Sequence, residues 1–308
     1  MINRILIRVK VLQIVYSYYQ QGNGNLNSAE NELLRSLQKS YDLYHYFLLL
    51  IPMLTDMLQR KIDASKHKYL PTEGELDPNT RLIDNRFSEQ LRTNDVLVRF
   101  GNRHGSLWME EDSAFMRDLL NEILQSDIYK LYLKTPDTYE SDRFFWQRVF
   151  KTIIFESDLL FDILGEKDIY WNGGMEIVCT FVMKTIKQFE AKMTRYQELI
   201  PMFKNEDDRL FATRLLHKTI IEHDANEALI NRQIENWDLE RIALIDLYIM
   251  QIALSEIKNF PSIPVNVTLN EYIDMARYYS TPKSGIFVNG ILDSIVNELR
   301  TSDLLFKD

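Results

Sequence analysis

The chain has 308 residues, of which 45% are hydrophobic and 26% are charged, with a formal net charge of −9. These are ordinary values for a soluble globular protein, and the acidic balance excludes a protein that coats nucleic acid indiscriminately. The single cysteine, Cys179, excludes an internal disulfide, and its apolar neighbours predict that it is buried. Because we find neither a signal peptide nor an apolar run of about 18 residues, we expect a cytoplasmic protein without a membrane segment.

Glycine and proline interrupt the chain rarely, with 10 and 8 residues respectively, which favours long helices over a sheet with tight turns. Apolar periodicity predicts an all-α fold. The expected helices span residues 2–20, 28–68, 87–100, 112–133, 141–164, 173–199, 206–222, 225–234, 239–258, 268–279 and 286–300. Residues 70–86 are expected to form a loop, and Gly101 to Gly105 a plain connector.

The first predicted helix is apolar around most of its girth, so we expect it to be largely buried. Its basic residues are Arg4 and Arg8, one turn apart, and Lys10 on another side. No carboxylate precedes Glu30 in the sequence. This asymmetry predicts local positive charge at the start of an otherwise acidic chain.

Residues for catalysis or metal binding are not arranged in any recognisable motif. The five histidines (His45, His67, His104, His217 and His223) lack the spacing of known metal sites, and there is no glycine-rich phosphate loop. The acidic clusters Glu110–Asp112 and Glu206–Asp208 stand where helices should begin, and carboxylates there complement the helix dipole. We therefore expect no metal, no cofactor and no enzymatic activity.

The last hundred residues carry the most specific pattern. The strings that form it are Trp237–Asp246, Gln251–Ile257, Pro264–Val267, Asn270–Arg277 and Phe287–Asp293. In this order and spacing they resemble the NusB family, and Arg8–Tyr16 resembles the first helix of that family. The resemblance implies an antiparallel helical bundle built from residues 1–45 and 205–308. Residues 46–204 are expected to be an inserted helical region of unknown role.

Proteins of the NusB family bind the boxA element of ribosomal RNA leader transcripts and help the RNA polymerase elongation complex to read through terminators. The resemblance implies RNA contacts at Arg4 and Arg8 and, around the start of the last helix, at Lys283, Ser284 and Phe287. Arginine offers a planar fork of donors to phosphate, and an aromatic ring can stack on an unpaired base. A helix N-terminus near Ile286 also favours phosphate.

The same resemblance implies a protein partner, NusE, which is also a small-subunit ribosomal protein. The family's contact helix maps onto Asp246 and Glu256. Asp246 lies in an apolar helix, where its charge needs either an internal partner such as Arg241 or a group on NusE. Family members commonly have arginine where this chain has Gln251, so the contacts of that helix are expected to differ here.

The RNA-binding hypothesis requires that the N-terminal arginines and the loop with Lys283 together form one positive patch. Two other functions remain open from the sequence. The same helical fold resembles the N-terminal domain of ribosomal RNA cytosine methyltransferases, although the cofactor domain of those enzymes is not found in this chain. Alternatively, the chain is a protein-interaction module that acts through the inserted region and does not bind RNA.

Overall fold

A computed structural model describes residues 1–22, 24–67, 69, 72, 76–108, 113–234 and 242–305. The regular structure of these residues is helical, and the only strand-like pairing among them is one isolated bridge between Ile2 and Phe203. The all-α prediction is confirmed. Among the described helices, none is long and apolar enough to cross a membrane.

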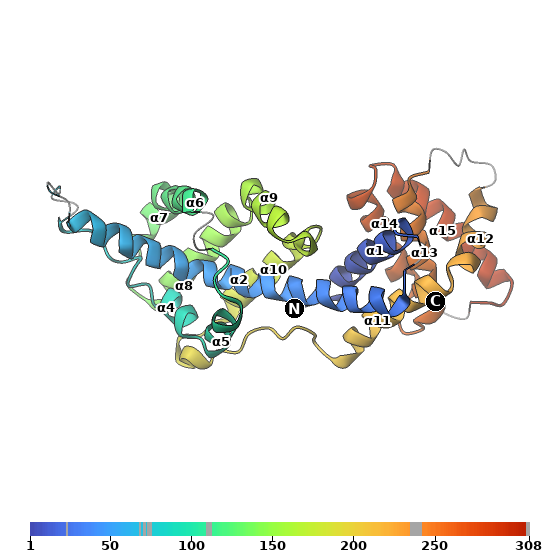
Figure 1. Ribbon diagram of the computed structural model, residues 1–308, viewed down its shortest axis with the longest axis horizontal. Helices are drawn as coiled ribbons and strands as arrows, with labels where there is room; N and C mark the ends of the chain where they lie inside the picture. The colour runs from blue at the N-terminus through green and yellow to red at the C-terminus, as the bar shows by residue number, and fades with distance from the viewer. Residues whose placement is uncertain are drawn as a thin grey trace. The chain divides into compact units, whose positions relative to one another are not determined.

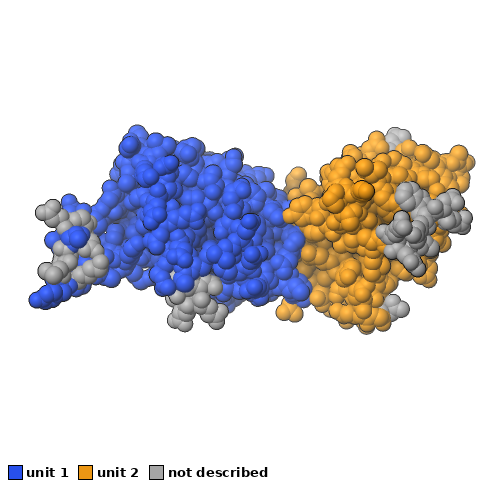
Figure 2. Space-filling view, turned by 90° about the horizontal axis from the view of Figure 1, so that it is seen from above, with its two compact units in different colours: residues 1, 39–202 blue, residues 2–38, 203–308 orange. Residues whose placement is uncertain are grey.

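The chain divides into two compact units (Figure 2). Unit 1 consists of residue 1 and residues 39–202, and unit 2 consists of residues 2–38 and 203–308. Helix α2 (Leu26–Lys66) contributes residues to both units and continues through Pro52. Unit 2 therefore combines a segment near the start of the sequence with the last third of it.

Unit 2 is built around helix α13 (Leu244–Asn259). Five helices of unit 2 pack against it, and Figure 1 shows several of them side by side. They are α1 (Arg4–Gln20), α11 (Glu206–Ile221), α12 (His223–Ile234), α14 (Val265–Tyr279) and α15 (Ser284–Thr301). Every residue of α13 from Tyr248 to Ile257 is buried. A helix with apolar residues on all sides is stable at the centre of a helical bundle, because only there are all of its faces shielded from water.

Helix α1 begins where the side chain of Asn3 accepts a hydrogen bond from the backbone N–H of Leu6 at 2.9 Å. This N-cap satisfies one of the N–H groups that the first turn leaves unpaired. The apolar residues from Leu6 to Leu12 are all buried, as the apolar pattern predicts. Only Ile5 and Tyr16 are exposed among its large hydrophobic residues.

Unit 1 packs shorter helices around the second part of α2. They are α4 (Arg86–Thr93), α5 (Asp95–His104), α6 (Ser113–Gln125), α7 (Asp127–Tyr132), α8 (Tyr139–Val149), α9 (Asp158–Lys167) and α10 (Met175–Gln188). A π-helical turn, Phe150–Ile154, follows α8, and 3-10 turns span Ile169–Trp171 and Ala191–Tyr196. The indole N–H groups of Trp108 and Trp171 donate to the carbonyls of Tyr46 and Lys39 on α2.

Several helices that the periodicity predicts as continuous are interrupted in unit 1. The predicted helix 87–100 is two helices that meet at Asn94, 112–133 breaks at Ser126, and 141–164 breaks before Ser157. At each break the side-chain oxygen accepts a backbone N–H two or three residues later and starts a new helix. Side-chain capping thus competes with helix continuation.

Other boundaries also differ from the prediction. Gly101 to His104 are the last turn of α5 instead of a connector, and Gly105, with φ 73°, ends that helix. The helix predicted at 173–199 ends at Gln188. The cluster Glu110–Asp112, part of the loop predicted at 70–86 and residues 235–241 lie outside the described residues.

Asn94 is expected to be a sensitive position because its buried side chain both caps α5 and bonds a carbonyl about a hundred residues away. Its oxygen accepts from Val96 and Leu97, and its amide donates to the carbonyl of Gln197 at 2.8 Å. Loss of the cap and of this buried bond in Asn94→Ala should reduce the free energy of unfolding by about 2 kcal/mol. Urea unfolding followed by circular dichroism measures this effect.

The control is Asn102→Ala, which changes an exposed asparagine in the same helix α5. It should alter the free energy of unfolding by less than about 0.5 kcal/mol. Equal effects of the two substitutions would contradict the capping role of Asn94.

Candidate nucleic-acid interface

Arg8 lies inside unit 2, where its guanidinium meets the carboxylate of Glu256 on α13. Its Nε donates to Oε2 at 2.8 Å and its Nη2 to Oε1 at 2.7 Å. The hydroxyls of Thr268 and Tyr272 on α14 donate to the same carboxylate, each at 2.9 Å. Arg8 and Glu256 are 3% and 0% exposed in their side chains. A two-pronged ion pair with two supporting hydroxyls therefore joins α1, α13 and α14.

Burial and the ion pair shift the pKa values of Arg8 and Tyr272 in this cluster. Burial lowers the pKa of Arg8, but the hydrogen bonds that it donates to Glu256 and the neighbouring charges outweigh burial, so the net pKa is raised. Burial and the charge of Glu256 raise the pKa of Tyr272 well above its usual value. The arginine thus stays charged and the phenol stays protonated as a donor.

This placement corrects two sequence-based predictions. Arg8, expected to contact RNA, is buried and its donors are taken by Glu256 and by Glu271 at 3.3 Å. Glu256, expected to contact NusE, has no exposed surface. Lys10 is also fully buried, and its Nζ donates to Gln13 at 3.1 Å. Arg8 and Lys10 therefore belong to the core of unit 2. A charge in an apolar interior is retained only where hydrogen-bond or ion-pair partners satisfy it, as Glu256 and Gln13 do here.

Arg4 is the exposed member of the N-terminal pair, with 39% of its side chain accessible. Its Nε lies 3.3 Å from Asp208, and its guanidinium lies over the ring of Phe211 at 4.9 Å. Asp208 belongs to the acidic first turn of α11. The positive charge of Arg4 is therefore partly offset by that turn.

Ser284 and Asp246 pair with each other inside unit 2. The Oγ of Ser284 donates to Oδ2 of Asp246 at 2.7 Å and accepts from the backbone N–H of Thr281. Both residues are buried, at 3% and 4% exposure, and Oδ1 of Asp246 has no hydrogen-bond partner among the described residues. The internal partner of Asp246 is thus a serine; Arg241 lies outside the described residues. Neither Ser284 nor Asp246 presents a surface to RNA or to a protein in this structure.

The single positive patch that the sequence predicts is not formed. Asp246, which holds the loop with Lys283, stands near the start of α13, and Glu256, which holds Arg8, stands near its end. Ten residues of helix separate them, which corresponds to about 15 Å. Arg8 is buried and is held about 15 Å along α13 from the loop with Lys283, so the RNA-binding hypothesis in its one-patch form is wrong, and any RNA contact must rest on a separate region.

A basic and aromatic surface does exist where α14 ends and α15 begins. We call it the α14–α15 corner; its residues are Arg277, Tyr278, Lys283, Ile286 and Phe287. Ile286 and Tyr278 are 77% and 63% exposed, Lys283 is exposed, and Phe287 is half-buried. The stem of Arg277 crosses Gly285, where an added Cβ would lie 2.5 Å from its Cγ. This contact places the arginine beside the turn that carries Lys283.

Sequence reasoning identified Lys283 and Phe287 but missed Arg277 and Tyr278. The sequence signal that could have identified these two residues is a cation followed by an aromatic residue directly before the predicted loop. In the structure Arg277 also pairs with Asp274 at 3.0 Å, although 59% of its side chain remains accessible.

Removing one member of the buried ion pair should be costly, because it leaves the other buried charge without its main partner. We expect Glu256→Gln or Arg8→Met to reduce the free energy of unfolding by about 3–5 kcal/mol. The double variant should lose clearly less than the two single losses added together. Urea unfolding of the three variants completes this cycle.

An exposed pair in the same unit is the control. Arg232 and Glu298 lie 3.2 Å apart and are 56% and 34% exposed, so Glu298→Gln should cost no more than about 1 kcal/mol. Additive losses in the Arg8 and Glu256 cycle would show that the two side chains do not depend on each other.

Comparisons with known proteins bear on the identity of the chain. The sequence model of the NusB family matches residues 180–297. A protein from Salinibacter ruber is 34% identical over 108 residues, which are 35% of this chain and 68% of the relative. One from Thermodesulfovibrio yellowstonii is 33% identical over 129 residues, which are 41% of this chain and 81% of the relative. Both are named transcription antitermination protein NusB.

No solved structure matches the chain at a significant level. The resemblance that the C-terminal motifs indicate is nevertheless confirmed by the relatives, one of which is matched over four fifths of its length. The chain belongs to the NusB family.

Proposed function

We propose that this chain is a cytoplasmic transcription antitermination factor that binds boxA-type ribosomal RNA leader transcripts through the α14–α15 corner. NusB is a family of transcription factors, and the relatives carry the name transcription antitermination protein. The observation that supports the RNA site is the exposure of Lys283, Arg277 and Tyr278 around one helix–helix turn.

The chemistry of the corner suits a single strand. Cationic side chains bind phosphate, and the positive end of the α15 dipole lies at the same turn. Tyr278 and Phe287 offer rings on which unpaired bases can stack, at about 1–3 kcal/mol for each base. Arg4 is retained as a secondary contact because it is exposed, although Asp208 competes for it.

The small binding free energy that this chain alone can supply indicates a protein partner. Two or three phosphate contacts of about 1 kcal/mol each fall far short of the ~8 kcal/mol of a micromolar complex. We therefore propose that a small-subunit ribosomal protein of the NusE type supplies further RNA contacts, within the RNA polymerase elongation complex. Because α13 is buried along most of its length, the partner is assigned to other helices of unit 2 rather than to Asp246 and Glu256.

We also propose that residues 46–204 are an insertion into the family fold. Unit 2 combines residues 2–38 with residues 203–308, and the alignments to the relatives span only 108 and 129 residues. The inserted region is then dispensable for RNA contacts at the α14–α15 corner.

The corner is tested by Lys283→Ala and Tyr278→Ala in an RNA shift assay with a boxA-type single strand. Tyr278→Ala should weaken binding by about 5- to 150-fold, the equivalent of one lost stack. Lys283→Ala should weaken binding and should reduce the salt slope of the affinity by about 0.7, the value for one phosphate of a single strand.

Arg300→Ala is the matched control, because it removes an exposed cation at the other end of the same helix, about 25 Å from Lys283. Its affinity should equal that of the unmodified chain. If Arg300→Ala and Lys283→Ala weaken binding equally, the α14–α15 corner is not the RNA site.

The partner is tested by titrating the same RNA with this chain alone and with its complex with the small-subunit ribosomal protein. The complex should bind at least tenfold more tightly, because each protein adds contacts to one strand. Equal affinities would remove the partner from the proposal. Asp246→Asn should leave complex formation unchanged, since the side chain is buried.

A further inference from the structure

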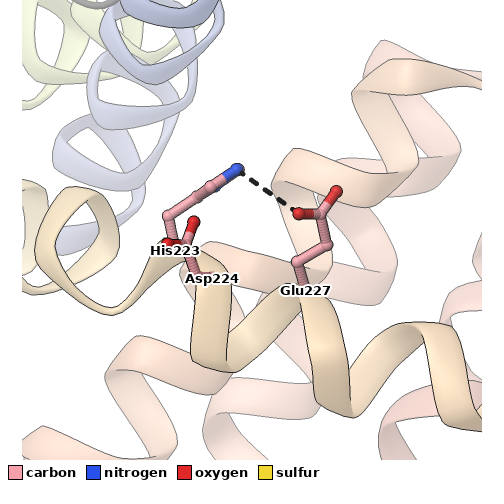
Figure 3. Close-up of side chains that lie close together, drawn as sticks. All are labelled: His223, Asp224 and Glu227. Atoms are coloured by element: carbon pink, nitrogen blue, oxygen red, sulfur yellow. Dashed lines mark ion pairs between the residues drawn. The ribbon is translucent and has the colours of Figure 1, made fainter.

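A histidine and two carboxylates gather on the first turns of α12. Figure 3 shows His223, Asp224 and Glu227, with the imidazole directed toward the carboxylate of Glu227. The Nε2 of His223 lies 3.8 Å from Oε2 of Glu227, and one ligand atom from each of the three residues lies within 4.8 Å of the others. Residues four apart on a helix share a face, so this proximity follows from the spacing of His223 and Glu227.

The imidazole is held in one orientation by groups outside this cluster. Its Nδ1 is 2.7 Å from Oε1 of Gln251, a side chain of α13 that is 2% exposed. The ring of Tyr19 on α1 stacks on it at 4.2 Å, and Tyr248 stacks on Tyr19 at 5.5 Å. Because the amide oxygen of Gln251 only accepts, Nδ1 is the donor in this hydrogen bond, and Nε2 is the ring nitrogen that faces Glu227.

No lysine or arginine among the described residues neutralises the two carboxylates. Neither Asp224 nor Glu227 forms an ion pair with lysine or arginine there, whereas the neighbouring Glu222 pairs with Lys218 and Lys258. The pKa of Tyr19 is raised, first by burial and then by neighbouring groups that include both carboxylates. The surface around Nε2 is therefore electronegative.

We propose that His223, Asp224 and Glu227 form a binding site for a divalent transition metal such as Zn²⁺. One imidazole nitrogen and two carboxylate oxygens are ligands that Zn²⁺ accepts, with water completing the tetrahedron. Metal–ligand bonds of about 2.1 Å place tetrahedral ligand atoms about 3.4 Å apart. The pair of His223 and Glu227 is close to this separation, and the exposed Asp224 offers a carboxylate oxygen within 4.8 Å of both.

The supporting hydrogen bond strengthens the assignment. A histidine that binds a metal commonly donates its other ring N–H to a fixed oxygen, which sets the tautomer and the ring orientation. Gln251 occupies that role here, and its burial fixes the position of the oxygen. The imidazole nitrogen favours Zn²⁺, Co²⁺ or Ni²⁺ over Mg²⁺ and Ca²⁺, which prefer oxygen ligands only.

The test is titration of the untagged, chelator-treated full chain with Co²⁺, followed by its visible absorption, and with Zn²⁺ by calorimetry. One saturable site is expected, and saturation should raise the Tm because metal binds the folded state. His223→Ala and Glu227→Gln should each weaken binding at least tenfold. Gln251→Met should weaken it by about 10- to 100-fold while all three ligands remain.

The matched control is His217→Ala. His217 also has Nε2 near a carboxylate, that of Glu30 at 2.8 Å, but is absent from the three-ligand group. Its loss should leave the Co²⁺ and Zn²⁺ titrations unchanged. Absence of a saturable site in the unmodified chain, or equal binding by His223→Ala, would overturn the proposal. Should Gln251→Met fail to fold, Glu227→Gln and Asp224→Asn, which alter exposed side chains, decide the question.

Discussion

The carboxylate of Glu256 is the point around which unit 2 is organised. It stands on a helix that is buried along most of its length and accepts four hydrogen bonds, two from Arg8 and one each from Thr268 and Tyr272. An unpaired carboxylate at this depth would be unstable. The first helix of the chain and the helix after α13 must both be docked before the charge is satisfied. Packing and electrostatics therefore select the same arrangement of α1, α13 and α14.

Sequence periodicity predicts most of the fold, because apolar residues recur at helical spacing along nearly the whole chain. It predicts α1 and α11 within a few residues of their bounds. It fails at Asn94, Ser126 and Ser157, where a polar side chain caps a new helix. Capping depends on whether the backbone turns at that residue, and the tertiary packing around it decides that turn.

The candidate site is less predictable than the fold for a related reason. A basic residue has the same place in a helical pattern whether it faces solvent or a buried acid 248 residues away, as Arg8 does. Lys283 was identified because it stands in a loop, where exposure is the rule. Arg277 was missed because it occupies the last turn of a helix, and His223 because its supporting oxygen, on Gln251, comes from another helix.

The span between Arg8 and Glu256 also has a consequence for synthesis. At about 5–20 residues per second, the ribosome needs roughly 12–50 s to add the 248 residues that separate them. During that interval the apolar α1 has left the exit tunnel without the helices that cover it, while residues 39–202 already form a contiguous segment able to collapse. The nascent chain thus exposes an apolar amino-terminal helix during this interval. We expect chaperones that act on the ribosome to bind it there.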